Sequence, residues 1–199
     1  AQAGSYSVVA TNNTGSTASV AATLTVSSNT SDPGRLINLS ILTPLAGGET
    51  MTIGTVLGGG AGTSGGKPLL VRAGGPSLAP LGITGFLPDP TITLVNTSAS
   101  PSVTVATNND WAGTTALSNA FAAVGAFAYA SATSKDAAIF QPSLAPGNYT
   151  VQVSDAGTGS GTVIAELYDA SGTAFTLATP RLVNVSVLKQ ISTGGSLTA

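Results

Sequence analysis

The chain has 199 residues, of which 42% are hydrophobic and 7% are charged, and its net charge of -2 includes no run of one sign. This composition can supply a core, but it gives neither nucleic acid nor an anionic membrane surface an electrostatic handle, and no apolar run approaches the ~18 residues of a membrane span. Cysteine and histidine are absent, which removes disulfides, thiolate nucleophiles, Ser-His-Asp triads and imidazole metal sites, so we expect neither an enzyme nor a cofactor.

The first 26 residues have the pattern of a β-hairpin. Tyr6, Val8 and Ala10 alternate along one strand, residues 12–15 form a turn, and a second alternating strand runs from Ala18. Two strands alone are marginal in water, so this hairpin needs a surface to pack on. Residues 27–34 are polar and rich in turn formers, and we interpret them as a linker.

From Arg35 onward, short apolar segments separated by glycine and proline predict an antiparallel β-sandwich of the jelly-roll kind. The glycine-rich residues 58–66 are expected to be a loop and not a phosphate site, because Pro68 follows Lys67 where such a site needs a serine or threonine. One short helix is expected at residues 114–124. The predicted strands are residues 35–42, 49–57, 67–73, 91–96, 102–107, 137–141, 147–154 and 161–169.

The opening segment of this domain occurs twice. Residues 35–42 (Arg-Leu-Ile-Asn-Leu-Ser-Ile-Leu) return at 181–188 as Arg-Leu-Val-Asn-Val-Ser-Val-Leu, and the match continues without a gap to Thr52 and Thr198. Such self-similarity is typical of arrays. It predicts one full repeat at residues 35–180, followed by the opening strands of another at 181–199.

A strand separated from its domain leaves backbone groups without partners. Our leading hypothesis is that residues 181–199 donate a strand to another copy of the chain. It would complete that copy's N-terminal hairpin or extend the open edge beside residues 35–42. The alternatives are a last strand that folds back into its own sheet, and an arbitrary fragment boundary. The expected interface residues are Arg181, Leu182, Val183, Val185, Val187, Leu188, Ile191, Tyr6 and Val8.

Residues 108–111 (Asn-Asn-Asp-Trp) allow two interpretations. Asn109 and Asp110, joined by Asp136 from a later segment, could offer oxygen ligands to calcium. Only one side chain of the four is charged, so we favour a turn made by asparagine and aspartate side chains, with Trp111 anchored in the core.

Charged side chains in apolar surroundings suggest internal pairs. Arg72 lies in an apolar strand, where an unpaired charge is costly, so we expect a pair with Asp89 or Glu166. The lysines could instead form covalent cross-links with asparagines beside a buried acid, as in some surface fibres. The sequence shows no such pairing.

Two resemblances extend this interpretation. Residues 3–26, beginning Ala-Gly-Ser-Tyr, resemble the last two strands of a bacterial immunoglobulin-like domain, although Gln2 stands where that family has aspartate. Residues 35–180 are similar to β-rich repeats of large secreted proteins from Verrucomicrobia and related bacteria. The motifs are Arg-Leu-Ile-Asn-Leu-Ser at 35–40, Leu-Leu-Val-Arg-Ala-Gly-Gly-Pro-Ser-Leu at 69–78, Asp-Pro at 89–90, Asn-Asn-Asp-Trp at 108–111, Ser-Lys-Asp-Ala-Ala at 134–138 and Pro-Gly-Asn-Tyr-Thr-Val-Gln-Val-Ser at 146–154.

The resemblance implies an exported, multidomain surface architecture and no defined enzyme. Low charge and abundant serine and threonine also favour an extracellular or cell-surface location. We therefore expect a structural subunit of an extracellular filament, assembled head to tail from copies of itself by strand donation. The alternative is a stalk or carbohydrate-binding module of a large surface protein, with surface glycans as partners.

Overall fold

A computed structural model describes residues 3–26, 34–60, 62–172, 175–191 and 196–199. The chain divides into two compact units, residues 1–34 and 35–199. The boundary between them coincides with the end of the predicted linker, most of which lies outside the described residues. Residues 181–199, which the repeat assigned to a following domain, belong to the second unit.

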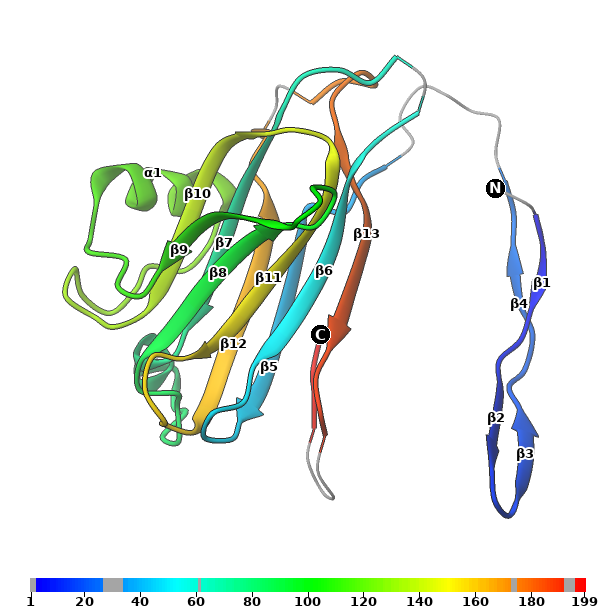
Figure 1. The fold of residues 1–199 in the computed structure, drawn as a ribbon, viewed down its shortest axis with the longest axis horizontal. Coiled ribbons are helices and arrows are strands. Elements are labelled where there is room, and N and C mark those ends of the chain that lie inside the picture. The colour runs from blue at the N-terminus through cyan, green and yellow to red at the C-terminus, as the bar shows by residue number, and fades with distance from the viewer. Residues whose placement is uncertain (1–2, 27–33, 61, 173–174, 192–195) are drawn as a thin grey trace. The chain divides into compact units, whose positions relative to one another are not determined.

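The second unit is a jelly-roll sandwich, which agrees with the predicted fold class (Figure 1). Its first eight strands form two antiparallel sheets, in the orders β10-β7-β12-β5 and β6-β11-β8-β9. Strands β5 to β8 therefore alternate between the two sheets, and so do strands β9 to β12. The strands are β5 (Asn38–Leu45), β6 (Met51–Gly58), β7 (Lys67–Gly74), β8 (Pro90–Asn96), β9 (Val103–Asn108), β10 (Ala137–Leu144), β11 (Gly147–Asp155) and β12 (Gly161–Asp169).

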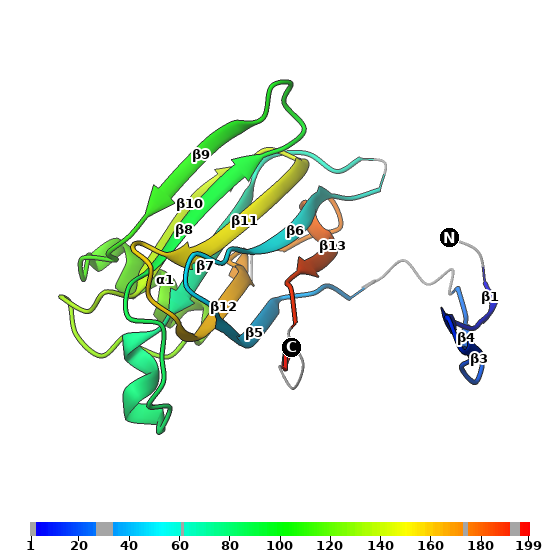
Figure 2. The same cartoon turned by 60° about the horizontal axis from the view of Figure 1, so that its bottom comes forward.

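A ninth strand, β13 (Arg181–Leu188), widens the second sheet at its β6 edge. Both views show it beside β6, on the side of the sandwich where β5 ends the other sheet (Figures 1 and 2). Strands β5 and β13, the two copies of the repeated segment, are thus edge strands of opposite sheets. This side of the sandwich carries the candidate site described below.

The core between the sheets follows from alternation of side chains along each strand. In β7, Leu69, Val71 and Ala73 point into the main core, whereas Leu70 and Arg72 point to the outer face of the sheet. The same two-residue period orders β6, β11 and β12. Complete burial of these apolar side chains is the main source of stability, at roughly 25 cal/mol per Å² removed from water.

A second cluster covers the outer face of the β10-β7-β12-β5 sheet. Helix α1 (Thr115–Val124) begins at Thr114, whose hydroxyl accepts a hydrogen bond from the amide of Leu117, and ends at Gly125 in the left-handed conformation. It lies beside β10 in Figure 1 and brings Phe121 against that sheet. The sequence pattern predicted this helix within one residue, but not the short 3-10 helix η1 (Pro76–Leu81).

The first unit contains two short antiparallel pairs instead of one continuous hairpin. Strands β1 (Gly4–Tyr6) and β4 (Ala22–Leu24) form one pair, and β2 (Val9–Asn12) and β3 (Gly15–Ala18) form the other. The predicted turn is present, because the Asn12 carboxamide oxygen accepts hydrogen bonds from the amides of Thr14 and Gly15. In the described part of the chain, no helix is long and apolar enough to span a bilayer.

Candidate assembly site in the C-terminal segment

The strand predicted to leave the molecule is held in its own sheet. β13 pairs antiparallel with β6, with Arg181 opposite Gly58 and Leu188 opposite Thr52. The hydroxyl of Thr55 also donates to the carbonyl of Asn184, at 3.1 Å. In the isolated chain, β13 is therefore folded back into its own sheet, which was the alternative to strand donation. The expected transfer to another copy would require this pairing to open.

The inward face of β13 differs from simple alternation because the strand contains a bulge between Leu182 and Asn184. The extra residue reverses the phase of the strand. Leu182 is 6% exposed and lies in the core, Val183 turns outward with 53% exposure, and Val185 and Val187 then pack against the core. Of the other expected interface residues in this segment, Leu188 and Ile191 are exposed and Arg181 is partly buried.

After β13 the chain crosses to the other sheet. Thr198 forms a two-hydrogen-bond antiparallel bridge with Leu42 of β5, at 2.8 and 3.1 Å. Beside it, the Thr43 hydroxyl donates to the carbonyl of Ser196, and Leu197 packs against the main core. The edge beside residues 35–42, one of the two places expected to accept a donated strand, is thus partly occupied by the chain's own end.

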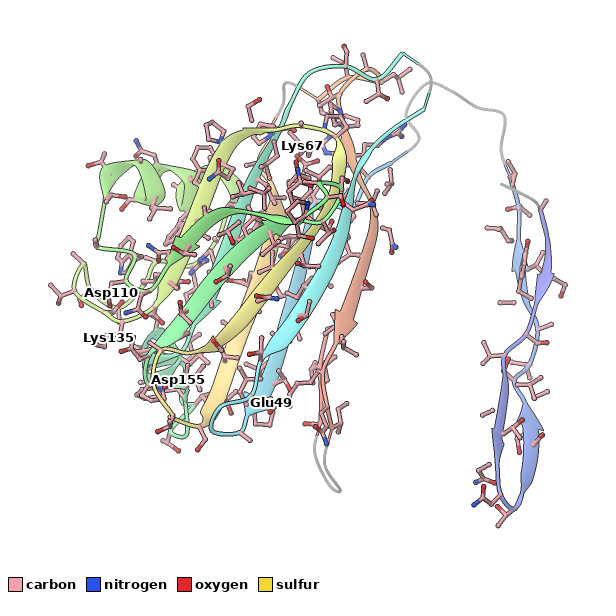
Figure 3. All side chains as sticks on the ribbon, viewed as in Figure 1. Glu49, Lys67, Asp110, Lys135 and Asp155 are labelled. Atoms are coloured by element: carbon pink, nitrogen blue, oxygen red, sulfur yellow. The ribbon has the colours of Figure 1, made fainter. Side chains whose placement is uncertain are left out.

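An ion pair joins the C-terminal segment to the β5–β6 turn. The ammonium of Lys189 contacts the carboxylate of Glu49, which also accepts a hydrogen bond from the amide of Ala46. Burial opposes ionisation of Glu49, but the hydrogen bonds and the charge of Lys189 outweigh it and lower its pKa. Figure 3 places Glu49 at the end of the sandwich opposite Lys67.

Tyr6 and Val8, the expected acceptor residues of the N-terminal hairpin, lie in the first unit. Tyr6 ends β1 and is 51% exposed, and Val8, between β1 and β2, is 73% exposed. Val20 is also strongly exposed. This unit offers apolar side chains to solvent, in keeping with the expectation that a short hairpin needs a further surface to pack on. Their role as an acceptor for a strand stays a prediction.

The Asn-Asn-Asp-Trp segment leaves β9 and is hydrogen-bonded to the segment around Asp136. Asp136 is fully buried and accepts hydrogen bonds from the amides of Gly75 and Ser77 and from the hydroxyls of Ser77 and Ser134. With both carboxylate oxygens used by protein donors, Asp136 is poorly placed to bind calcium. Its backbone carbonyl accepts from the amide of Trp111, which holds the two segments together.

The other candidate oxygen ligands of the segment face solvent. Asn109 is exposed, and the Asp110 carboxylate lies 3.9 Å from the ammonium of Lys135, near it in Figure 3. Lys135 also contacts Asp89 at 2.8 Å. Trp111 is 7% exposed, as expected for an anchor. Within the described ranges, no three aspartate or glutamate side chains gather into a metal site.

Arg72 pairs with Glu166, one of its two predicted partners. Their closest atoms are 3.2 Å apart across β7 and β12, and a second guanidinium nitrogen donates to the carbonyl of Phe127 at 2.8 Å. The guanidinium lies over the rings of Phe121, Phe127 and Tyr129, at 4.2 to 4.4 Å from their centroids. Contacts of this kind stabilise a desolvated cation. The sequence did not reveal these rings, because they come from α1 and the loop after it.

A second buried ion cluster lies where β7 begins and β12 ends. Asp169 contacts the ammonium of Lys67 and, at 3.1 Å, the guanidinium of Arg35. Lys67 also donates to the hydroxyl of Ser171. Burial lowers the pKa of Lys67, although Asp169 opposes the change. The lysine pairs with a carboxylate and not with an asparagine, and Arg35 contacts the same carboxylate, so we interpret the contact as an ion pair and not a cross-link.

No protein-family model matches this chain, and neither the comparison with curated proteins nor that with solved structures found a similar protein. The function must therefore be argued from the sequence and the geometry alone.

Proposed function

We propose that this protein is a non-catalytic structural subunit of an extracellular filament, and that residues 181–199 form the joint between copies. The supporting observation is the place of β13. Among the described residues it is an edge strand paired on its β6 side alone, on the same side of the sandwich as the other edge strand β5.

β13 is suited to exchange between copies. It lies in the sheet opposite to that of β12, the strand before it, and Leu182 is the one side chain of β13 that is buried. A terminal strand that leaves its place and fills the same place in another copy makes the same contacts, so exchange costs little free energy at equilibrium. Exchange from chain to chain gives open, head-to-tail assemblies. Strand donation then competes with a closed monomer, in which each chain keeps its own β13 in its own sheet.

The composition supports a structural and extracellular role. The chain has few charges and many hydroxyl side chains, and the buried carboxylates Asp136, Glu166 and Asp169 are engaged by hydrogen-bond donors or cations. A carbohydrate-binding role has less support. Exposed aromatic rings are a common platform for sugars, whereas Trp111, Tyr129, Tyr149 and Tyr168 of the second unit are all buried and Tyr6 of the first unit is half exposed. Binding to glycans would be an alternative outcome of the tests.

The decisive experiment locks β13 in its own sheet. The chain has no cysteine, so a Thr52→Cys/Leu188→Cys variant can form only the disulfide between two opposing residues of β6 and β13. Oxidised in dilute solution, it should stay monomeric, while the reduced form should give filaments in negative-stain microscopy. Oxidised after assembly, it should give a ladder of covalently linked chains on a non-reducing gel.

A matched control variant and two possible results would show where the proposal fails. An Asn184→Asp variant adds a charge at an exposed residue of the same strand and should assemble like the parent chain. Filaments that form equally well from the oxidised monomer would exclude residues 181–199 as the joint. A parent chain that remains monodisperse at all concentrations would exclude the filament, and glycan binding on an array would then favour the surface-module alternative.

A further inference from the structure

The two copies of the repeated segment contact one another in a reciprocal way. Leu188 of the second copy pairs with Thr52 of the first, and Leu42 of the first pairs with Thr198 of the second. Leu188 corresponds to Leu42 in the repeat, and Thr198 to Thr52. Each copy therefore uses the same two positions to bind the other, which is the pattern of a local two-fold axis.

The side chains obey the same relation. At three positions, a residue that faces the core in the first copy has an apolar counterpart that packs against the same core in the second, whereas Ile191, the counterpart of the buried Leu45, is exposed. The pairs are Leu39 with Val185, Ile41 with Val187, and Met51 with Leu197. The two copies match both in hydrogen-bonded register and in inward-facing side chains, so chance does not explain the contact between them.

The pocket between the two copies also has the arrangement of a local two-fold axis. A pocket of about 560 Å³ is lined by Thr43–Leu45 and the β5–β6 turn from one copy and by Lys189–Ile191 and Ser196 from the other. Residues 43–45 correspond to residues 189–191 in the repeat. Equivalent positions thus face each other across the pocket, as they do beside a two-fold axis.

We propose that the edge formed by residues 35–58, here called the β5–β6 corner, is a self-complementary docking surface whose occupant is the same corner of a second copy of this chain. Residues 181–188 and 196–198 lie along this surface within one chain. When they leave it, β5 of each chain can pair with β6 of the other, so that each sheet continues into the opposite sheet of its partner. This goes beyond the proposed filament, because it concerns what the corner binds without its C-terminal segment.

The arginines that begin the two copies support a whole second corner as the occupant. Arg35 is held by Asp169 of its own sheet at 3.1 Å. The corresponding Arg181 has its buried Nε atom without a hydrogen-bond partner among the residues that the structure describes. A second chain would place its own Arg35 there together with its own Asp169, so the charge would arrive already paired.

The test releases the C-terminal segment in the full chain. A Val185→Asp/Val187→Asp variant places two charges on the core-facing side of β13 and should free the segment. The freed chain should double its mass in sedimentation equilibrium, and an added peptide of residues 181–199 should return it to a monomer. The matched Asn184→Asp variant, charged at an exposed position of β13, should remain unchanged by either measure. A folded, released chain that stays monomeric and ignores the peptide would overturn the inference.

Disulfide mapping gives the register. In the released background, Leu42→Cys with Thr52→Cys should produce a dimer joined by two disulfides, because each position faces the other one across the proposed axis. Dimers that do not cross-link would overturn the docking geometry. This outcome is separate from the filament test, which depends on exchange of residues 181–199 in the parent chain.

If the charged variant does not fold, as judged by circular dichroism, the parent chain still gives an answer. A peptide of residues 35–52 in excess should compete with the chain's own segment and raise hydrogen exchange of the β13 amides. The same peptide carrying Ile41→Asp should have no effect, because the charge falls on its core-facing side. Unchanged β13 exchange with the native peptide at saturation would contradict the proposal.

Discussion

Residues 35–52 and 181–198 have closely related sequences, yet the fold embeds them to different depths. Ile41 is fully buried in β5, whereas its counterpart Val187 is only partly buried in β13. Leu45 is 2% exposed, and its counterpart Ile191 is 53% exposed. The repeated pattern sets which face of the strand turns inward. Depth of burial is set by what lies opposite, and here the first copy is part of the jelly roll while the second is an addition to its edge.

The arginine that begins the first copy is also held more firmly than the arginine that begins the second. Arg35 contacts Asp169 and donates to the carbonyl of Gly172, and its guanidinium lies 4.1 Å from the centroid of Phe175. No acid is found within ion-pair distance of Arg181 among the described residues. One copy is therefore fixed by a buried ion pair and by the core, and the other by backbone pairing, partial burial and the Lys189–Glu49 pair. This difference makes the second copy the better candidate to exchange.

The largest expected effect comes from removing the acid that anchors the first copy. Asp169→Asn leaves the fully buried Lys67 and the adjacent Arg35 without their carboxylate. Breaking a buried pair in this way typically lowers the free energy of unfolding by about 3–5 kcal/mol. Chemical denaturation should measure it. Arg181→Gln is the comparison and should change stability by less than about 0.5 kcal/mol. A similar cost for both would mean that Arg181 has an acidic partner of its own.

Truncation of equivalent apolar side chains gives the next effect. Ile41→Ala opens a cavity in the main core and should cost about 2–5 kcal/mol. Val187→Ala removes a smaller, partly exposed side chain and should cost about 1 kcal/mol or less. Global unfolding should report the first, whereas hydrogen exchange confined to β13 should report the second. Equal costs in global unfolding would show that both copies belong to one cooperative core.

The sequence predicted the strands of the sandwich, but not this contrast between the two copies. Short apolar segments between glycine and proline indicated the strands, and the cost of an unpaired charge named Glu166 as one of two candidate partners of Arg72. The bulge at Leu182 could not be foreseen, because a two-residue period carries no sign of an inserted residue. Nor could the pairing of β13 with β6, since edge strands of similar pattern compete for the same partner and only the assembled sheets decide.

Acid should loosen the second copy before the first. The lowered pKa of Glu49 means that its pair with Lys189 stabilises the folded chain above the unfolded-state pKa, near about 4.3, and that this contribution is lost as pH falls through the folded-state pKa. Hydrogen exchange of β13 should therefore rise, relative to β5, as the solution is acidified below about pH 4. Glu49→Gln should remove most of this pH dependence. A rise that persists in Glu49→Gln would assign it to another acid.

The smallest effect concerns the serine shared by the two copies. In the first copy the Ser40 hydroxyl donates to Glu166 at 3.3 Å, whereas in the second Ser186 lies over Gly54, where an added Cβ would stand 2.7 Å from its Oγ. The serine hydroxyl can rotate away, so Gly54→Ala should lower the free energy of unfolding of β13 by no more than about 1 kcal/mol. Adding Ser186→Ala should recover that loss, because the two side chains then no longer overlap. Ser40→Ala offers no such rescue, since it removes a hydrogen bond. If Ser186→Ala left the cost of Gly54→Ala unchanged, β13 would not lie directly over Gly54, and the reciprocal register of the two copies would fail with it.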